Sequence, residues 1–408
     1  MMKYLLFWMG LFLFVQSSIG QMDGCMDPLA SNYNPIAQNN DGSCVYASTI
    51  ISPTSSMVLP NSVQETSGVF FYDGMYWTHN DDTEAMFFAV DSITGDVVDT
   101  VIWDCLSNID WEESQVNQTH LIIGDIGNNL GNRTDLKFFL IPLVDFYAND
   151  ITAVDTLQFV YEDQVSFSPS LNNHDFDAEA FLVTSDSIFI FSKCWASSST
   201  KRYALPLISG NQIAQLRETY NVNGLITGAT FFDQGQSVAL CGYTSFLQPF
   251  VWLLWDYSSN GFFSGNKRRV ELGLPFHQVE AIVSRTNQQF YLSNERYVGA
   301  LTIEQKWHQW NVSSLFQSPN GVDASANTQI GNPYPMPTTG LFQLDMTGPH
   351  CFWRYEIYNA QGGMIKRGSH LGNRMNFDLT SFPDGMYYVH IVKRETRIVR
   401  TIIKQSSH

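Results

Sequence analysis

Short strands that recur at regular intervals are the feature that most constrains the fold of this chain. Between about residues 48 and 320 no long stretch has helical periodicity, whereas aromatic and β-branched runs alternate with Gly, Asn and Asp turns. One pattern repeats: an acidic or small polar residue, an apolar run, a turn, and a second apolar run ending in polar residues. Its five copies are 47 to 67 residues apart and begin at Glu65, Glu112, Glu179, Thr227 and Glu280.

This spacing predicts a β-propeller over residues 48–320, because repeated four-stranded sheets around an axis hide edges that would otherwise aggregate. Two further strands follow most pairs, as at Ala85–Val90 with Val97–Trp103. The fifth unit lacks an obvious fourth strand, which Ile50–Leu59 would supply, closing the ring. We therefore predict an all-β, five-bladed propeller, or a six-bladed one if a unit has been missed. A β-sandwich or a solenoid is the alternative.

A propeller would gather the polar ends of these runs on one face. First strands line the central channel and second strands run antiparallel to them, so the start of one lies beside the end of the other. The residues expected at the starts are Glu65, Asp110, Glu112, Asp177, Glu179, Thr227 and Glu280. Those expected at or after the ends are His79, Asn80, Asp81, Asp125, Asn128, Asn129, Lys193, Tyr243, Asn294, Glu295 and Arg296.

A ring of carboxylates around a narrow channel either binds a cation or raises some of its own pKa values by repulsion. Oxygen donors suit Ca²⁺ or Mg²⁺, and the predicted channel ligands are Glu65, Asp110, Glu179 and Glu280. The candidate catalytic residues are His79, Glu112, Glu179 and Glu280, with His277 as a second candidate base. The alternative, which we favour, is that these acids accept backbone N–H groups between blades. The glycine-rich loop Asp125–Arg133 is interpreted as a connection, with cation binding as its alternative.

The amino-terminal end carries two features. Residues 1–20 read as a signal peptide, with Lys3 before an apolar run. Residues 21–47 form a unit too small for a core, so a Cys25–Cys44 bridge is expected to hold it. This unit resembles the Cys-bounded repeats of secreted bacterial proteins that are similar to thrombospondin type 3 calcium repeats. Its candidate Ca²⁺ ligands are Asp27, Asn32, Asn34 and Asp41, which would otherwise serve turn geometry.

The carboxy-terminal end has its own composition. From Asn332 onward nine Lys/Arg face five Asp/Glu, a balance of +4 against −21 for the rest of a chain whose net charge is −17. A linker at 321–331 precedes strand-like runs that predict a small Ig-like antiparallel β-sandwich over 332–408. The runs are Leu341–Met346, Tyr355–Tyr358, Met375–Leu379, Tyr387–Val392 and Ile398–Ile403.

This tail resembles the type A sorting domain of the type IX secretion system. The matching residues are the Asn332-Pro333-x-Pro335 opening, Tyr355-x-Ile357-Tyr358-Asn359-x-x-Gly362, Pro383-x-Gly385-x-Tyr387-x-Val389 and the closing Ile402-Ile403-Lys404. Met336 stands where the family usually has Asn. The resemblance implies passage through the periplasm and across the outer membrane, with the secretion machinery as partner. The propeller weakly resembles the extracellular SdiA-regulated and phytase-esterase-like groups.

The net charge and the absence of known catalytic motifs exclude several classes of function. An acidic chain repels phosphate backbones, so nucleic acid is a poor partner, and no apolar run after the leader reaches the length of a transmembrane helix. No nucleophile elbow or zinc-protease motif is present. We therefore expect a secreted or surface-attached, non-catalytic scaffold that binds a protein or glycan. The alternative is a divalent-metal-dependent hydrolase of an ester or phosphoester. The sequence does not specify the pairing of Cys105, Cys194, Cys241 and Cys351.

Overall fold

The computed structural model describes residues 22–82, 84–148, 151, 154–258, 261–286, 288–299, 301–316, 331–345, 352–371, 374–393 and 396–405. Their regular elements are strands and short 3-10 turns, so the predicted all-β class is confirmed. No helix in these ranges is long and apolar enough to cross a membrane. The predicted signal peptide, Cys351 and most of the predicted linker lie outside the described residues. The 3-10 turns are η1 (Asn61–Val63), η2 (Leu143–Asp145), η3 (Asp233–Gly235), η4 (Phe262–Ser264) and η5 (Ser313–Leu315).

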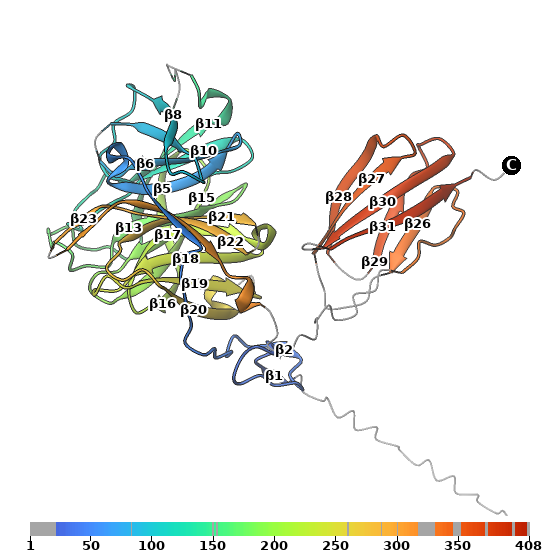
Figure 1. Cartoon of the computed structure of the whole chain (residues 1–408), viewed down its shortest axis with the longest axis horizontal. Helices are drawn as coiled ribbons and strands as arrows, with labels where there is room; N and C mark the ends of the chain where they lie inside the picture. Colours follow the sequence, from blue (N-terminus) through green and yellow to red (C-terminus); the bar gives the residue numbers. More distant parts are fainter. Residues whose placement is uncertain are drawn as a thin grey trace, which may run out of the picture.

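The central region contains five antiparallel units of four strands each. A parallel strand pair joins units 2 and 3 into one eight-stranded sheet, and unit 4 gains a fifth strand. Figure 1 labels most of these strands. Unit 1 holds β5 (Thr66–Tyr72), β6 (Met75–Asn80), β7 (Met86–Val90) and β8 (Val97–Ile102). Unit 2 holds β9 (Trp111–Val116), β10 (His120–Asp125), β11 (Lys137–Pro142) and β12 (Asp155–Tyr161). Unit 3 holds β13 (Asp177–Val183), β14 (Ser187–Lys193), β15 (Ser199–Pro206) and β16 (Gly210–Asn221). Unit 4 holds β17 (Leu225–Phe232), β18 (Ser237–Tyr243), β19 (Pro249–Trp255) and β20 (Asn266–Leu272).

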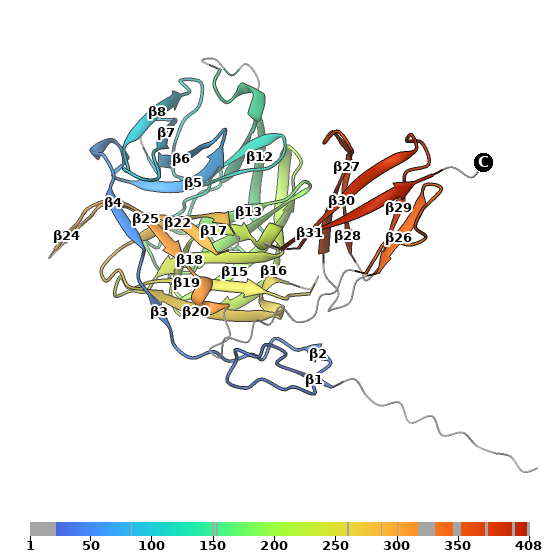
Figure 2. The same ribbon diagram turned by 45° about the vertical axis from the view of Figure 1, so that its right-hand side comes forward.

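Unit 5 is completed from the other end of the region. Its strands are β21 (Val279–Thr286), β22 (Gln289–Asn294), β25 (Lys306–Asn311) and β4 (Ser55–Val58), which pairs antiparallel with β25. The first strands contact one another in the order β5, β9, β13, β17, β21 and back to β5. The units therefore form a closed, propeller-like ring, and the segment Ile50–Leu59 closes it as predicted. A two-stranded excursion, β23 (Tyr297–Val298) with β24 (Thr302–Ile303), leaves unit 5 (Figure 2).

The apolar side chains that alternate along the strands hold the units of the ring together. One hydrophobic cluster lies between each pair of neighbouring units, and each cluster draws residues from both. Phe87 of unit 1 packs with Trp111 of unit 2, for example, and Phe290 of unit 5 packs with Phe232 of unit 4. Because no unit can bury its faces alone, the repeats stabilise one another.

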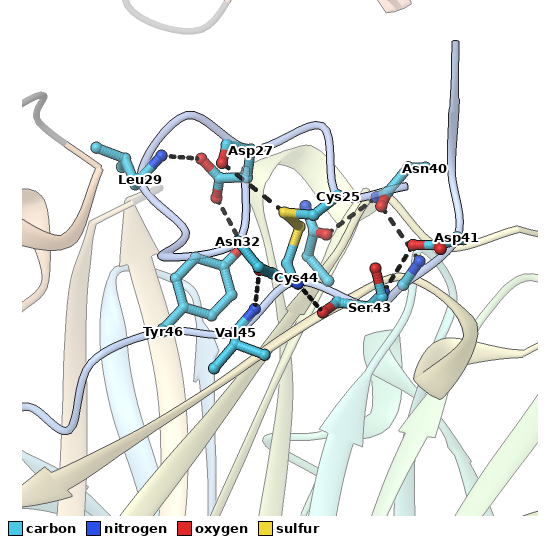
Figure 3. The surroundings of a disulfide bond; sticks show 12 residues. Cys25, Asp27, Leu29, Asn32, Asn40, Asp41, Ser43, Cys44, Val45 and Tyr46 are labelled. Atoms are coloured by element: carbon cyan, nitrogen blue, oxygen red, sulfur yellow. Dashed lines mark hydrogen bonds between the residues drawn. A yellow bond between two sulfur atoms is a disulfide. The ribbon is translucent and has the colours of Figure 1, made fainter. Parts of the chain in front are cut away.

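The disulfide-closed amino-terminal unit packs beside unit 4 (Figure 3). The predicted Cys25–Cys44 bridge is present, and β1 (Asp23–Gly24) and β2 (Asn39–Asn40) form a minimal parallel pair. The Asn40 amide donates to Asp256 at 2.8 Å and the Lys267 ammonium to the Gly42 carbonyl at 2.9 Å. Beyond it, β3 (Ile50–Ile51) extends the sheet of unit 4 by pairing with β20.

Replacing Cys25 and Cys44 together by alanine should loosen this unit. The bridge closes a loop with a sequence separation of 19, which corresponds to about 3 kcal/mol of chain entropy. The apolar cluster there has only three buried members, Cys25, Ala30 and Cys44. We expect cleavage within residues 22–46 under limited proteolysis while the propeller resists. Unchanged resistance of this segment would contradict the prediction. A single Cys105→Ala variant is the control, because Cys105 is an exposed free thiol.

The tail folds as two sheets around a separate core. One pairs β26 (Leu341–Asp345) with β29 (Arg374–Asp378). The other has the order β28 (Met364–Leu371), β27 (Phe352–Asn359), β30 (Gly385–Lys393), β31 (Thr396–Lys404). Their shared core contains only tail residues, among them Phe342, Phe377 and Val389. The sequence pattern does not indicate β28, because this edge strand carries Lys366, Arg367 and Gly368 instead of clear alternation.

Candidate functional site

The starts of the first strands and the ends of the second strands do meet, as predicted. The pairs are Thr66 with Asn80, Trp111 with Asp125, Asp177 with Lys193, Leu225 with Tyr243 and Val279 with Asn294. Because the first strands form the ring, these pairs lie at one end of it. We call the acidic part of this end the acidic mouth, comprising Glu65, Asp81, Asp110, Glu112, Glu179, Glu280 and Glu295.

Each first strand has a β-bulge just after its start. The register shifts there in all five units, leaving extra residues that have no partner on the second strand. A bulge re-aims the side chain of its extra residue. The extra residues are Ser67 and Gly68, then Glu112, Glu179, Thr227 and Glu280. Glu65 precedes β5 and is not one of these extra residues, so the sequence aligned it with this set in the wrong register. The equivalent place in unit 1 is taken by Ser67 and Gly68.

The two neutral bulge residues bind the next unit. The Ser67 hydroxyl donates to the backbone carbonyl of Glu112 and contacts its carboxylate at 3.2 Å. The Thr227 hydroxyl donates to the carbonyl of Val279. The bulges of units 1 and 4 therefore link neighbouring units, but through hydroxyls that donate to carbonyls. The expectation was that acids at these positions accept backbone N–H groups.

The three acidic bulge residues are buried with few donors around them. Glu112, Glu179 and Glu280 are 6%, 4% and 7% exposed, and burial raises the pKa of each above its ordinary value. Repulsion by the Glu179 carboxylate raises the pKa of both Glu112 and Glu280 further. The Oε2 atom of Glu179 has no hydrogen-bond partner among the described residues. Burial therefore shifts all three carboxyl groups toward their neutral form.

Lys193 is the cation of this centre. Its ammonium donates to Oε1 of Glu179, and it lies 5.3 Å from the ring centroid of Tyr243. Burial lowers the pKa of Lys193, but Glu179, Tyr243 and Glu280 more than compensate, so the pKa is raised overall. Lys193 also opposes the rise in the pKa of Glu179, which burial still brings to about 8. A protein cation therefore already occupies part of the predicted metal site.

The centre of the ring is filled below the mouth. Glu113, on β9, accepts the amide of Ala229 on β17 at 3.3 Å, and Gln115 donates to the Ala229 carbonyl at 3.0 Å. β9 and β17 are not neighbours in the ring, so these contacts cross its axis. Burial raises the pKa of the fully enclosed Glu113. Sequence reasoning missed this residue, although the Trp111-Glu112-Glu113 run was the available signal.

Two predicted site acids have structural partners instead. Asp125 pairs with Arg133 at 2.7 Å and with Lys137 at 3.0 Å. Asp177 accepts the amide of Asn128 at 2.6 Å and the indole N–H of Trp195 at 2.8 Å. Arg133 also donates to the Gly127 carbonyl at 2.8 Å. Arg133 therefore holds the loop Asp125–Arg133 in place through contacts within the loop. This agrees with its interpretation as a connection between strands.

Gly127 allows Asp110 and Glu112 to lie against this loop. A Cβ at position 127 would stand 2.3 Å from Cγ of Asp110 and 2.5 Å from Oε1 of Glu112. We expect Gly127→Ala to destabilise the protein by about 1–3 kcal/mol, because the two carboxyl groups must shift. Urea unfolding would measure it. Gly127→Ala should destabilise the protein less when Asp110→Ala is also present, because one of the two clashing carboxyl groups is then gone. If the effects of the two substitutions on the free energy of unfolding are strictly additive, the steric argument is wrong.

Glu65, Asp81 and Glu295 form the outer rim of the mouth. One carboxylate oxygen of each lies within 4.8 Å of the others, and all three side chains are partly buried. Burial raises the pKa of Asp81 to about 6 and that of Glu295 to about 8. Among the residues that the structure describes, these three acids lie close enough together to share one metal ion. Of the predicted channel ligands it includes Glu65 but not Asp110, Glu179 or Glu280.

The raised pKa values predict that stability falls as pH rises. The pKa values of Asp81, Asp110 and Glu295 are about 6, 7 and 8 in the folded protein, against about 4 in an unfolded chain. Between these limits the folded state binds more protons, so each group lowers stability by up to about 1.4 kcal/mol per pH unit. Unfolding at pH 5 and pH 8 would test this. Glu295→Gln should flatten the slope, whereas greater stability at pH 8 would contradict the prediction.

The candidate bases His79 and His277 differ in accessibility. His79 is fully buried, with Nε2 2.8 Å from the Ser114 hydroxyl and Nδ1 3.0 Å from the Asn80 carbonyl oxygen, and burial lowers its pKa to about 4. His277 is 7% exposed, and its Nε2 has no hydrogen-bond partner in the described chain. Burial lowers the pKa of His277, and the Lys306 charge lowers it further.

In the amino-terminal unit the candidate calcium ligands serve the backbone. Asp27 accepts the amide of Leu29 at 2.9 Å and the hydroxyl of Tyr46 at 2.7 Å, and Asn32 accepts the amide of Val45 at 2.8 Å (Figure 3). Asn34 and Asp41 accept amides two residues ahead, at 3.2 and 2.9 Å. These are the turn contacts named as the alternative to a calcium site.

Comparisons with known proteins identify the tail. Residues 332–405 match the model of the secretion system C-terminal sorting domain. The chain therefore carries a type IX sorting domain, and the protein is secreted across the outer membrane to the cell surface or the medium. No curated protein matches the sequence.

Solved structures resemble the chain only distantly. One is an exo-β-1,3-galactanase from Phanerochaete chrysosporium (8% identity, TM-score 0.39, 88% of this chain and 94% of that chain). Another is a β-fructofuranosidase from Bombyx mori (8%, 0.37, 88% and 87%). A third is a chain of the mitotic checkpoint complex (11%, 0.30, 60% and 61%), so only about three fifths of that chain is spanned. Likenesses at this level carry no argument about activity or ligand.

Proposed function

We propose that residues 48–320 are a five-bladed propeller that acts as a non-catalytic binding scaffold outside the cell, followed by a small Ig-like sorting domain. The acidic mouth is its binding surface, and its ligand is a cationic, lysine- or arginine-rich segment of an extracellular protein. The observation that carries this proposal is the charge balance of the mouth, in which Lys193 is the cation that offsets the charges of Glu112, Glu179, Glu280 and Glu295. The electrostatic couplings among them join the rim to the bulge acids.

The geometry favours binding over catalysis. His79 has both ring nitrogens within hydrogen-bond distance of protein oxygens and is enclosed, so it is a poor general base. Glu179 is bonded to Lys193. The rim carboxyls remain partly accessible, and a ligand cation there would convert their mutual repulsion into attraction.

Binding of basic and acidic peptides of equal length to the secreted protein would test this proposal. The rim variant Glu65→Gln/Asp81→Asn/Glu295→Gln should weaken binding of the basic peptide, and added salt should weaken binding to wild type. The matched control is Asp96→Asn/Asp99→Asn/Asp104→Asn, which removes three exposed acids from unit 1 and its following loop. Equal affinity for both peptides, or equal effects of the two triple variants, would refute a cationic ligand.

The rim cluster also supports a second candidate, a divalent-metal-dependent hydrolase. Three carboxylate oxygens within 4.8 Å can hold one Ca²⁺ or Mg²⁺ ion, and such an ion activates bound water. Elemental analysis with ester and phosphoester assays separates the candidates. Bound metal and turnover that are both lost in the rim variant would favour the hydrolase, whereas wild type without turnover would favour the scaffold.

A further inference from the structure

A groove separates the amino-terminal unit from unit 4. It has a volume of about 360 Å³ and lies between residues 44–49 on one side and Tyr220, Trp252 and the residues of β20 on the other. Both ribbon views place the amino-terminal unit beside β20 (Figures 1 and 2). Ligand pockets in proteins span about 300–1,000 Å³, so the groove has room for a small ligand group. We call it the basic groove.

The basic groove is positively charged in an otherwise acidic protein. Lys267, Arg268 and Arg269 line it together with one carboxylate, that of Glu271, which pairs with Arg269 at 2.7 Å. Lys267 donates to the carbonyls of Gly42 and Gly265, at 2.9 and 2.7 Å. Among the described residues neither Lys267 nor Arg268 forms an ion pair. Neither cation is in direct contact with a carboxylate, although the charges of Asp41 and Glu218 act on Lys267 and that of Asp27 acts on Arg268.

Arg268 has a spare donor. Its terminal nitrogens donate to the Leu315 carbonyl at 3.0 Å and the Thr49 hydroxyl at 3.2 Å, whereas its buried Nε has no hydrogen-bond partner in the described residues. A buried, unsatisfied N–H is costly. Burial also lowers the pKa of Lys267 and of Arg268. An anion bound in the groove would offset the cost of desolvating these two cations.

Aromatic rings flank the cations. The Arg268 guanidinium lies 5.1 Å from the ring centroid of Tyr46. Tyr220 stacks on Phe263, with centroids 4.6 Å apart, and meets Trp252 edge-on at 5.4 Å, so it is a fixed wall of the groove. Flat rings beside guanidinium and ammonium groups suit a ligand with an apolar ring face and an anionic substituent.

We propose that the basic groove binds an acidic sugar residue of an extracellular polysaccharide. Lys267 and Arg268 hold its carboxylate or sulfate, and its ring lies against the aromatic wall at Tyr220. The site is independent of the acidic mouth, because it uses none of the same residues and prefers the opposite charge. The disulfide-closed unit forms one wall, which gives this unit a role in binding.

The test is calorimetric titration of the full-length chain with trigalacturonate, with its methyl ester as the neutral probe and with a sulfated trisaccharide. We expect the free acid to bind about tenfold or more tightly than the ester, the factor that one lost charge-assisted hydrogen bond would give. Tighter binding of the sulfated sugar would assign the group as a sulfate. Tighter binding of trigalacturonate would assign it as a carboxylate. Failure of both acidic sugars to bind, or equal binding of acid and ester, would overturn the proposal.

Variants locate the site. Lys267→Gln and Arg268→Gln should each weaken binding of the acidic sugar about tenfold. Arg285→Gln, which removes an exposed charge near Tyr76, should not. If Arg268→Gln fails to fold, Lys267→Gln still tests the proposal. The Lys267 ammonium bonds only to carbonyl oxygens, so its loss should leave the fold intact. Unchanged affinity in Lys267→Gln would place any observed binding elsewhere and overturn the assignment. The rim variant of the acidic mouth should leave sugar binding intact.

Discussion

Lys193→Met should destabilise the propeller by about 3–5 kcal/mol at pH 8, the cost of removing one partner from a buried ion pair. Lys193 is 4% exposed and bonded to Glu179, which is equally buried. Without the ammonium, an ionised Glu179 faces Glu112 and Glu280 with no cation to offset its charge. The acids escape this cost only by taking up protons, so the loss should shrink as the pH falls toward 5.

Urea unfolding of Lys193→Met at pH 5, 6.5 and 8 would measure this effect. Lys201→Met is the matched control, because Lys201 pairs with Asp163 at 2.7 Å but both side chains are partly exposed, and such a pair contributes about 1 kcal/mol or less. Adding Glu179→Gln to Lys193→Met should recover part of the loss. A variant as stable as wild type at pH 8 would show that Lys193 does not compensate the buried acids.

The sequence predicted the convergence of the five units because one observable pattern, polar residues at strand starts, is repeated at each blade. It could not predict which residue in unit 1 takes the equivalent place. There the bulge contains Ser67 and Gly68, so the equivalent position falls two or three residues beyond Glu65. Only the strand register decides this point, and register depends on pairing between strands that sequence spacing does not specify.

The rest of the candidate site depends on contacts between distant segments. Glu65 and Glu295 lie 230 positions apart in the chain, at the two sides of the ring closure, yet they share the rim with Asp81. Lys193 was expected on the polar face, but its place beside Glu179 required the structure. The basic groove joins residues 44–49 to unit 4, and no local sequence signal connects the two.

Deleting residues 332–408 should abolish secretion and leave the propeller folded. The sorting domain is the part that the secretion machinery recognises, and it matches over residues 332–405. Its hydrophobic core contains only tail residues, and the five clusters of the propeller contain none of them. Removing the tail therefore removes no apolar contact from the ring.

We expect the truncated chain to accumulate in the periplasm, with the same thermal unfolding midpoint for the propeller as in the full-length chain. Immunoblots of periplasm and medium, with calorimetry of the purified proteins, would measure both. Val389→Asp is an independent route to the same outcome, because it places a charge in the tail core, where Val389 is fully buried. Met386→Asp on the same strand is its control, since Met386 is exposed. If Val389→Asp blocks export and Met386→Asp does not, the folded sandwich is the recognised element. Equal export of both would instead assign recognition to an unfolded or linear segment of the tail.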